Sequence, residues 1–168
     1  MKKKIFIVGA LVFGVLFIVG GVAHAGAVHY VSGRSSVDER EIRWDGGTTY
    51  RDQLNAAMNT WNARGRVTIA ADTPLTYEDL RIYDVNQPDV PWVGQYRYSL
   101  LGTDEMILNR GHLLRATNAQ RQNVATHELG HALGLAHSTL GNVMFDLMTS
   151  VIQLGPQDTS DYSFLWGN

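Results

Sequence analysis

Three histidines within eleven residues could bind a single metal ion. The segment 127–137 reads His-Glu-Leu-Gly-His-Ala-Leu-Gly-Leu-Ala-His. His127 and His131 are four residues apart, and on a helix this spacing places both imidazoles on one face. Two neutral imidazole nitrogens so placed can reach one zinc ion at about 2.0–2.1 Å. The spacing therefore predicts a helix that carries two ligands of a zinc ion.

Gly134 allows a third ligand, His137, to reach the same ion. Glycine after a helix adopts the left-handed conformation without steric cost and turns the chain sharply. We expect this turn to bring His137 back toward the metal. Three protein ligands leave a fourth position for water, which is typical of catalytic zinc sites. A purely structural three-histidine site is the alternative.

Glu128 is the candidate general base. As the neighbour of His127 on a helix it points about 100° away from it, which places the carboxylate beside the metal and makes it poorly suited to ligation. Zinc lowers the pKa of bound water to about 7 and polarises a carbonyl group. Glu128 could accept the proton of that water and pass it to a leaving amine. Because His-Glu-x-x-His also occurs by chance, the prediction of a hydrolase depends on Gly134 and His137 as well.

The flanking sequence predicts one α/β domain with a mostly parallel sheet, because helical and strand patterns alternate along it. Thr117 or Asn118 can cap the metal-binding helix, Thr48 or Thr49 can cap an earlier helix that stops at Gly65, and Pro156 can begin a terminal helix. The expected strands have alternating or β-branched residues; they are 41–44, 66–70, 80–85, 93–101 and 105–109.

Residues 1–25 are typical of a secretory signal peptide. Three lysines at positions 2–4 precede an apolar run, and Ala23-His24-Ala25 matches a cleavage site. The alternative is an uncleaved membrane anchor, since about 20 apolar residues can span a bilayer. We expect a polar N-terminal arm at 26–40, a metallopeptidase domain at 41–168, and an exported, secreted product. Membrane contact is expected only if the segment stays uncleaved.

The composition narrows the partners and the chemistry. After residue 25 the chain has 11 arginines against 16 acidic residues, a net charge of −5, which argues against nucleic acid as a partner. The 168 residues contain no cysteine, so no thiolate can act as a ligand or nucleophile and no disulfide can form. We expect a monomer held together by its core, with bound metal contributing to its stability.

The segment 127–137 resembles the zinc signature of the metzincin peptidases, H-E-x-x-H-x-x-G-x-x-H. Ser138 after the third histidine and Val143-Met144-Phe145 resemble the matrixin branch, whose Met-turn contains such a methionine. The resemblance implies one catalytic zinc on His127, His131 and His137. It also implies a twisted, mostly parallel sheet with an antiparallel edge strand, an active-site helix, a Met-turn and a C-terminal helix. A peptide would bind extended against residues 105–109, by adding a strand to an exposed edge.

The sequence departs from the matrixin pattern in several places. Asp146 stands where proline commonly follows the Met-turn, so substrate preference cannot be carried over. Phe145 excludes the tyrosine ligand of other metzincin branches, and we expect no cysteine-containing propeptide, because the 168 residues contain no cysteine. Calcium could bind through Asp84, Asp89 or Asp104, but solvated loop acids explain these residues more simply.

These patterns together predict a secreted zinc-dependent endopeptidase in which Glu128 assists the attack of water on a peptide bond. Two alternatives stay open. One is a metzincin of another branch that acts on cell-wall peptide, and the other is a membrane-anchored zinc-containing binding protein without turnover.

Overall fold

The protein is described by a computed structural model, which covers residues 28–167. The predicted signal peptide lies outside the described residues. The strands are β1 (Glu41–Gly46), β2 (Thr68–Ala71), β3 (Leu80–Val85), β4 (Gly94–Arg97) and β5 (Asp104–Asn109). The helices are α1 (Arg51–Asn62), α2 (Arg110–Leu113), α3 (Asn118–Ala132) and α4 (Pro156–Trp166). No helix among the described residues is long and apolar enough to cross a membrane.

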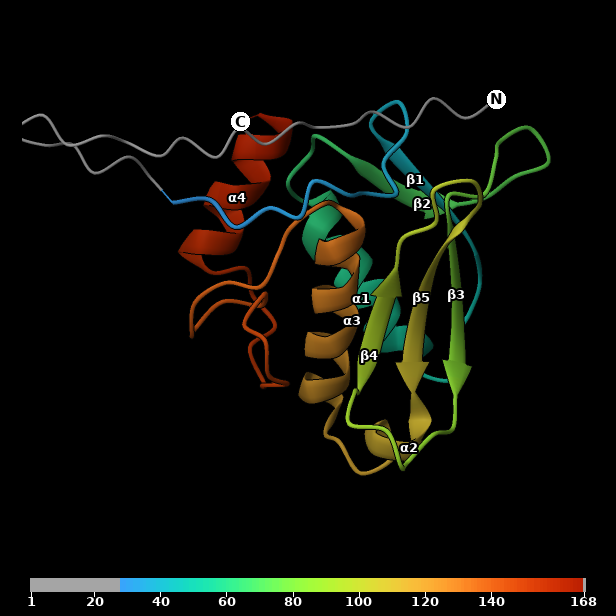
Figure 1. Ribbon diagram of the computed structural model, residues 1–168, viewed down its shortest axis with the longest axis vertical. Helices are drawn as coiled ribbons and strands as arrows, with labels where there is room; N and C mark the ends of the chain where they lie inside the picture. The colour runs from blue at the N-terminus through green and yellow to red at the C-terminus, as the bar shows by residue number, and fades with distance from the viewer. Residues whose placement is uncertain (1–27, 168) are drawn as a thin grey trace, which may run out of the picture.

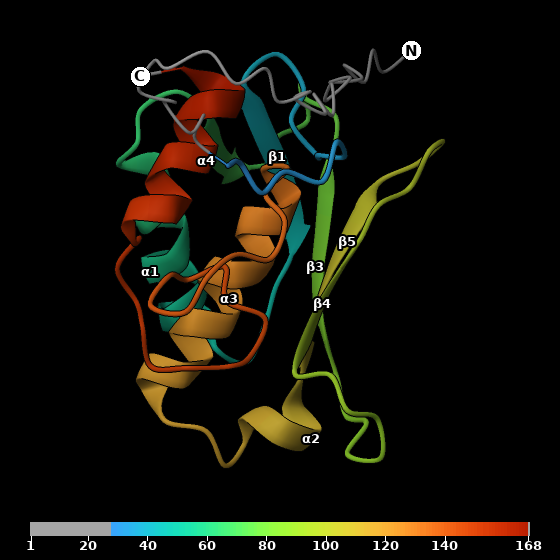
Figure 2. The ribbon, with the colours of Figure 1, turned by 60° about the vertical axis from the view of Figure 1, so that its left-hand side comes forward.

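The five strands form one sheet in the order β2-β1-β3-β5-β4. The pairs β1–β2, β1–β3 and β3–β5 are parallel, and β4 runs antiparallel to β5 at the edge. Figures 1 and 2 show α1, α3 and α4 on one side of this sheet, with α3 beside β4. The prediction of an α/β domain with a mostly parallel sheet and an antiparallel edge strand is confirmed.

The core lies between the sheet and the two long helices. Trp61 of α1 and Leu129 of α3 are almost completely buried, and both belong to the same apolar cluster as Ile82 and Met106 of the central strands. The indole Nε1 of Trp61 also donates a hydrogen bond of 2.8 Å to the carbonyl of Thr126. A buried apolar contact and a satisfied polar group thus fix α3 against α1, and α3 carries two of the histidines.

One strand expectation was wrong. Residues 105–109 are strand residues, but β5 is paired on both sides, with β3 and with β4. The exposed edge next to α3 belongs to β4. The hairpin between β4 and β5 folds β4 back over the outer side of β5. Strand order depends on pairing between distant segments, and residue alternation within a strand does not encode it.

The expected caps were partly correct. Thr117 caps α3 in a reciprocal box with Gln120, with hydrogen bonds of 3.2 and 2.9 Å, and α4 begins at Pro156. The cap of α1 was wrong, because Tyr50 holds that position without a side-chain hydrogen bond. Thr48 and Thr49 bind the carboxylate of Asp84 instead, which ties the start of α1 to the end of β3.

Candidate metal centre

The end of α3 is built to turn the chain toward the metal site. Gly134 has a φ angle of +96°. Its N–H donates to the carbonyl of His131 at 2.9 Å, and the N–H of Leu135 donates to that of Gly130 at 3.0 Å. These two bonds form a Schellman motif, in which glycine provides the left-handed residue. The predicted turn therefore exists, and it directs the chain to His137.

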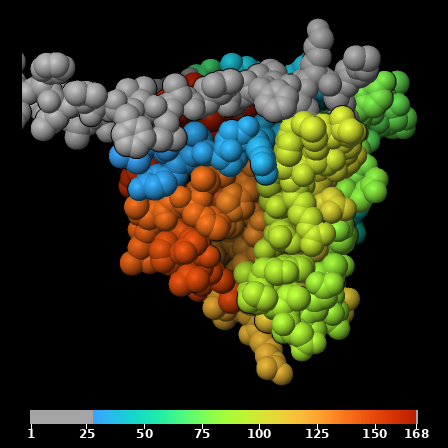
Figure 3. All heavy atoms as spheres, viewed as in Figure 1, coloured from blue at the N-terminus to red at the C-terminus, as the bar shows by residue number. Residues whose placement is uncertain are grey.

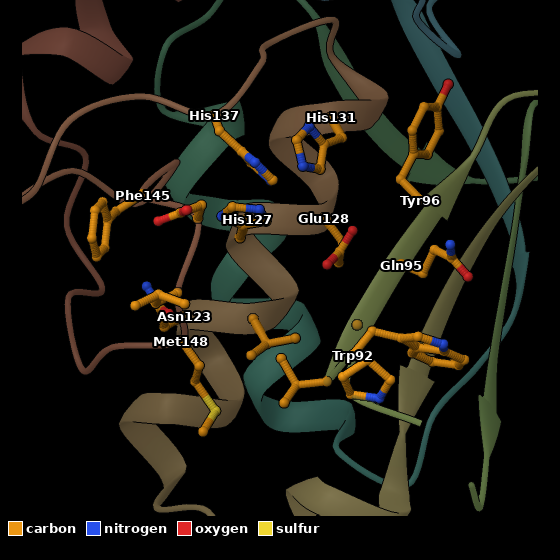
Figure 4. A pocket seen from close by; sticks show the side chains of 16 residues that line it. Trp92, Gln95, Tyr96, Asn123, His127, Glu128, His131, His137, Phe145 and Met148 are labelled. Carbon is orange, nitrogen blue, oxygen red and sulfur yellow. The ribbon is translucent and has the colours of Figure 1, made fainter. Parts of the chain in front are cut away.

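The three histidines come together at one point. Their metal-binding nitrogens lie within 4.8 Å of one another, and the ring centroids are 4.7–5.1 Å apart. Among residues 28–167 this is the one group of three or more histidines or acids able to hold a metal ion. Figure 4 shows the three rings directed toward one another, His127 and His131 from α3 and His137 from the following loop.

Backbone carbonyl groups orient two of the rings. The Nδ1 atom of His127 lies 2.9 Å from the carbonyl oxygen of Val143, and that of His131 lies 2.9 Å from the carbonyl oxygen of Leu135. A carbonyl accepts only from a protonated nitrogen, so each Nδ1 carries the hydrogen and each Nε2 keeps its lone pair free. This arrangement is typical of metal-binding histidines, and the donor set fits zinc.

Burial keeps these imidazoles neutral. Desolvation lowers the pKa of His127 to about 3, with a further contribution from the neighbouring His131. Desolvation likewise lowers the pKa of His131. Because a metal competes with protons for these nitrogens, a lowered pKa leaves them ready to coordinate at neutral pH. His137 is exposed, so the centre opens to solvent on that side.

The Met-turn packs directly beneath α3. Met144 is completely buried, and a Cβ on Gly130 would lie only 2.3 Å from its sulfur atom. Glycine at position 130 therefore lets the methionine approach the helix between the two histidines. The carbonyl of Met144 also accepts a 2.7 Å hydrogen bond from the N–H of Ser138, next to the third histidine. Met144 thus forms a hydrophobic floor beneath the helix that carries the first two histidines.

Asp158 of α4 holds the Met-turn in place. Its carboxylate accepts hydrogen bonds from the backbone N–H groups of Val143 at 2.7 Å, Met144 at 3.1 Å and Gly155 at 2.8 Å. The side chain is buried, and this burial raises its pKa despite the three donors. The bond from Gly155 caps the start of α4, and the two bonds from Val143 and Met144 fasten the Met-turn to this helix.

Glu128 lies beside the histidines and is not part of the ligand group. Its residue exposure is 6%, and desolvation raises the pKa of the carboxyl to about 8 in the metal-free protein. The backbone N–H of Tyr96 on β4 donates to this carboxyl and partly offsets the rise in pKa. A buried carboxyl with a raised pKa, beside a metal site, has the properties of a general base.

A cleft runs between α3 and β4 in front of these groups. It encloses about 420 Å³, and the histidines and Glu128 line its inner wall. Figure 3 shows it as a hollow between the orange surface of α3 and the following loop and the yellow-green surface of β4. Trp92 and Tyr96 border it on the strand side, and Val124 and Met148 on the helix side.

Asn123 also lines this cleft, and no pattern in the sequence indicated it. The side chain is buried, its amide donates to the carbonyl of Val151 at 2.7 Å, and its oxygen accepts from the N–H of Thr149 at 2.9 Å. One turn before His127, it thus ties the loop after the Met-turn to α3. Both polar atoms of its amide group are hydrogen-bonded within the protein, so we assign Asn123 a role in shaping the cleft.

The acids considered for calcium do not gather into one site. Asp104 is buried and binds the hydroxyls of Ser36 and Tyr96, while Asp84 binds Thr48. Asp89 is exposed. Within residues 28–167 no group of three acids forms a cation site there.

The N-terminal arm contacts the metal centre more closely than expected. Tyr30 accepts a 2.9 Å hydrogen bond from the N–H of Ala136, the residue before the third ligand. Ser32 donates to the carbonyl of Gly134 at 2.8 Å, and Val31 forms a bridge with Leu135. The described part of the arm thus packs along the turn that positions His137.

The model of the matrixin family, peptidase M10, matches residues 19–167. The chain belongs to the matrixin family. Membership makes it a zinc-dependent metallopeptidase domain, and the three convergent histidines are consistent with the zinc that the family requires.

No curated protein matches the matrixin chain. A solved structure described as the GM1 bound form of the ECX AB5 holotoxin is similar, with 14% sequence identity and a TM-score of 0.45. The similarity covers 75% of this chain and 70% of that one. At this identity and TM-score the similarity says nothing about function.

Proposed function

We propose that this matrixin domain is a secreted endopeptidase, with zinc held by His127, His131 and His137 and with Glu128 as general base. The observation that carries the proposal is the convergence of three imidazoles, two of them oriented by backbone carbonyls, and one buried carboxyl on the wall of an open cleft. Zinc bound there would polarise the scissile carbonyl and lower the pKa of the attacking water.

Each protein group has a separate task in this reaction. The carbonyl groups of Val143 and Leu135 hold two imidazoles in the tautomer that presents Nε2. Glu128 accepts the proton of the attacking water and delivers it to the nitrogen of the leaving amine. The Tyr96 N–H keeps the carboxylate aimed at that position. A zinc-containing protein without turnover would not need this aimed carboxylate.

The substrate is a peptide in extended conformation that adds to β4. This strand is the free edge of the sheet and borders the cleft, whereas β5 is already paired on both sides. Hydrogen bonds between the backbone of a peptide and an edge strand can form with many peptide sequences. Pockets beside the strand then select among the side chains. The cleft opens to solvent beside the exposed His137, which leaves room for a longer chain to pass the metal site and supports the endopeptidase proposal.

The test compares Glu128→Gln with Glu105→Gln, a matched change on β5. Glu128→Gln should keep one zinc per chain and lose about 10²–10⁴-fold in kcat on casein or a fluorogenic peptide. Glu105→Gln should keep wild-type activity. If Glu128→Gln cleaves the peptide at the wild-type rate, Glu128 is not the general base. Absence of stoichiometric zinc from purified wild-type protein, by elemental analysis, would reject the metal site.

Export is tested separately by the intact mass and N-terminal sequence of the protein recovered from the medium. Cleavage after Ala25 should give a chain that begins at Gly26. A full-length chain found in the membrane fraction would favour the uncleaved anchor.

A further inference from the structure

Gly94 is the point where the edge strand comes closest to the proposed catalytic helix. A Cβ built on Gly94 would lie 2.7 Å from Oε1 and 2.9 Å from Cγ of Glu128, and 2.7 Å from Cγ1 of Val124. Separations below 3.0 Å are essentially never made by real Cβ atoms. The space that a side chain at position 94 would need is therefore occupied by the proposed general base and by Val124.

The backbone conformation does not itself demand glycine at this position. Gly94 is absent from the described residues with positive φ, and it lies in the regular pairing of β4 with β5, opposite Leu108. Alanine can adopt an extended strand conformation at little cost. The missing side chain matters for the space it leaves between β4 and α3.

Two residues of β4 thus lie against the carboxyl group of Glu128. Gly94 leaves room for the side chain of Glu128, and the N–H of Tyr96, two residues along the strand, donates to its carboxyl. Figure 4 shows Glu128 reaching from α3 toward β4, between the histidines and Tyr96. The contact excludes water, since Glu128 is only 6% exposed.

We propose that Gly94 is a positioning residue for Glu128. The absence of a side chain at position 94 sets where the carboxylate lies relative to the three imidazoles. This inference rests on the proposed function, because it assigns Gly94 a role only if Glu128 moves a proton. A methyl group would meet side-chain atoms of Glu128 and Val124 and no backbone atom among its three nearest neighbours, so it would displace the carboxylate without breaking the strand.

The first experiment measures kcat and KM for Gly94→Ala on a fluorogenic peptide. A misplacement of about 1 Å in a reacting group can cost about 10²-fold in rate. We expect kcat to fall about 10- to 100-fold, KM to change less than about threefold, and the zinc content to stay at one per chain. A merely structural role would instead lower zinc content and thermal stability together with activity.

The matched control is Gly102→Ala in the β4–β5 connection. A Cβ there meets only Ser99 Oγ, at 3.1 Å, and Gly102 has no positive φ. This variant should keep kcat, KM and zinc at wild-type levels. A comparison of the two variants separates the effect of replacing a glycine in this hairpin from the effect of filling the space beside Glu128.

The second experiment adds Val124→Ala to Gly94→Ala. Removing Cγ1 of Val124 gives β4 room to shift along α3, so the double variant should recover at least fivefold in kcat over Gly94→Ala. Val124→Ala alone supplies the reference, because it also alters the cleft wall. Rescue by a second change in the same contact is evidence for steric positioning.

Each other outcome has a definite meaning. Wild-type kcat in Gly94→Ala overturns the inference while Glu128→Gln still tests the function independently. If Gly94→Ala and the double variant both fail to fold, Gly94 serves folding and the inference is also overturned. If Glu128→Gln is fully active, the proposed function fails, whatever Gly94→Ala does.

Discussion

Two buried aspartates on α4, three residues apart, hold two different segments against the metal centre. Asp158 accepts three backbone N–H groups, two of them from the Met-turn. Asp161 accepts the N–H of Tyr30 at 3.1 Å and contacts His29 Nδ1 at 3.2 Å, both in the N-terminal arm. One carboxylate thus fixes the floor under the histidines, and the other fixes the arm beside the turn to His137.

The two contacts differ in how completely they are satisfied. Both oxygens of Asp158 have donors, and its partners are 15 residues or fewer away in sequence. Asp161 is equally buried, but its Oδ2 has no hydrogen-bond partner within residues 28–167, and its arm contacts span about 130 residues. A short loop with paired donors holds more firmly than a distant arm. We therefore expect the Met-turn to be the more essential attachment.

The largest effect should come from Asp158→Ala. It leaves three backbone N–H groups without an acceptor, two of them in the buried Met-turn, and each such loss costs about 1–3 kcal/mol. We expect a loss of at least about 3 kcal/mol in the free energy of unfolding, with weaker zinc retention. Urea denaturation and elemental analysis would measure both. If stability falls by less than about 1 kcal/mol, the Met-turn does not depend on this carboxylate.

Asp161→Ala should have a smaller effect, about 1–2 kcal/mol, because one carboxylate oxygen lacks a donor in the part of the chain that the structure describes. Zinc content should stay at one per chain. The arm should become accessible to limited proteolysis at residues 28–34, which mass spectrometry can map. An equal loss of stability and zinc in Asp158→Ala and Asp161→Ala would contradict the difference between the two attachments.

Protonation of His127, whose ring lies against the Met-turn, should lower the stability of the metal-free protein in acid. The folded-state pKa of His127 is about 3, below its ordinary 6.5, so the fold favours the neutral ring. Stability is then lost as pH falls below about 6.5 and continues to fall toward about 3. Asp158 has the opposite sign, because its raised pKa makes protonation favour the fold. Glu128 has the opposite sign over this window, because its pKa is raised to about 8, so the test uses EDTA-treated Glu128→Gln protein. Its thermal melts from pH 8 to 5 should show a loss of stability below about pH 6.5. That loss should persist when Asp161→Ala is added and should become smaller when His127→Phe is added.

The smallest effect should come from Asp146→Asn. This residue follows the Met-turn, is exposed and lines the cleft, so it has no role in holding the floor. Stability should stay within about 0.5 kcal/mol of wild type. The ratio of kcat/KM for peptides with arginine against leucine next to the cleaved bond should fall about two- to fivefold, and less in high salt. An unchanged ratio at low salt would show that this carboxylate does not contribute to substrate choice.

The sequence by itself determined the parts of this protein that depend on short-range spacing. His127 and His131 share a helical face, Gly134 ends the helix in the left-handed conformation, Thr117 caps it and Pro156 begins the last helix. Each of these features is decided within a few residues, where helix geometry and glycine stereochemistry leave little choice.

The tertiary structure alone decided what depends on segments far apart in the chain. It placed β4 and not β5 at the open edge, brought Gly94 against Glu128, and seated the Met-turn on Asp158. Such contacts follow from how the whole sheet and helices pack, and no local pattern carries that information. The ligands could be predicted from their spacing, but the environment that orients them exists only in the folded chain.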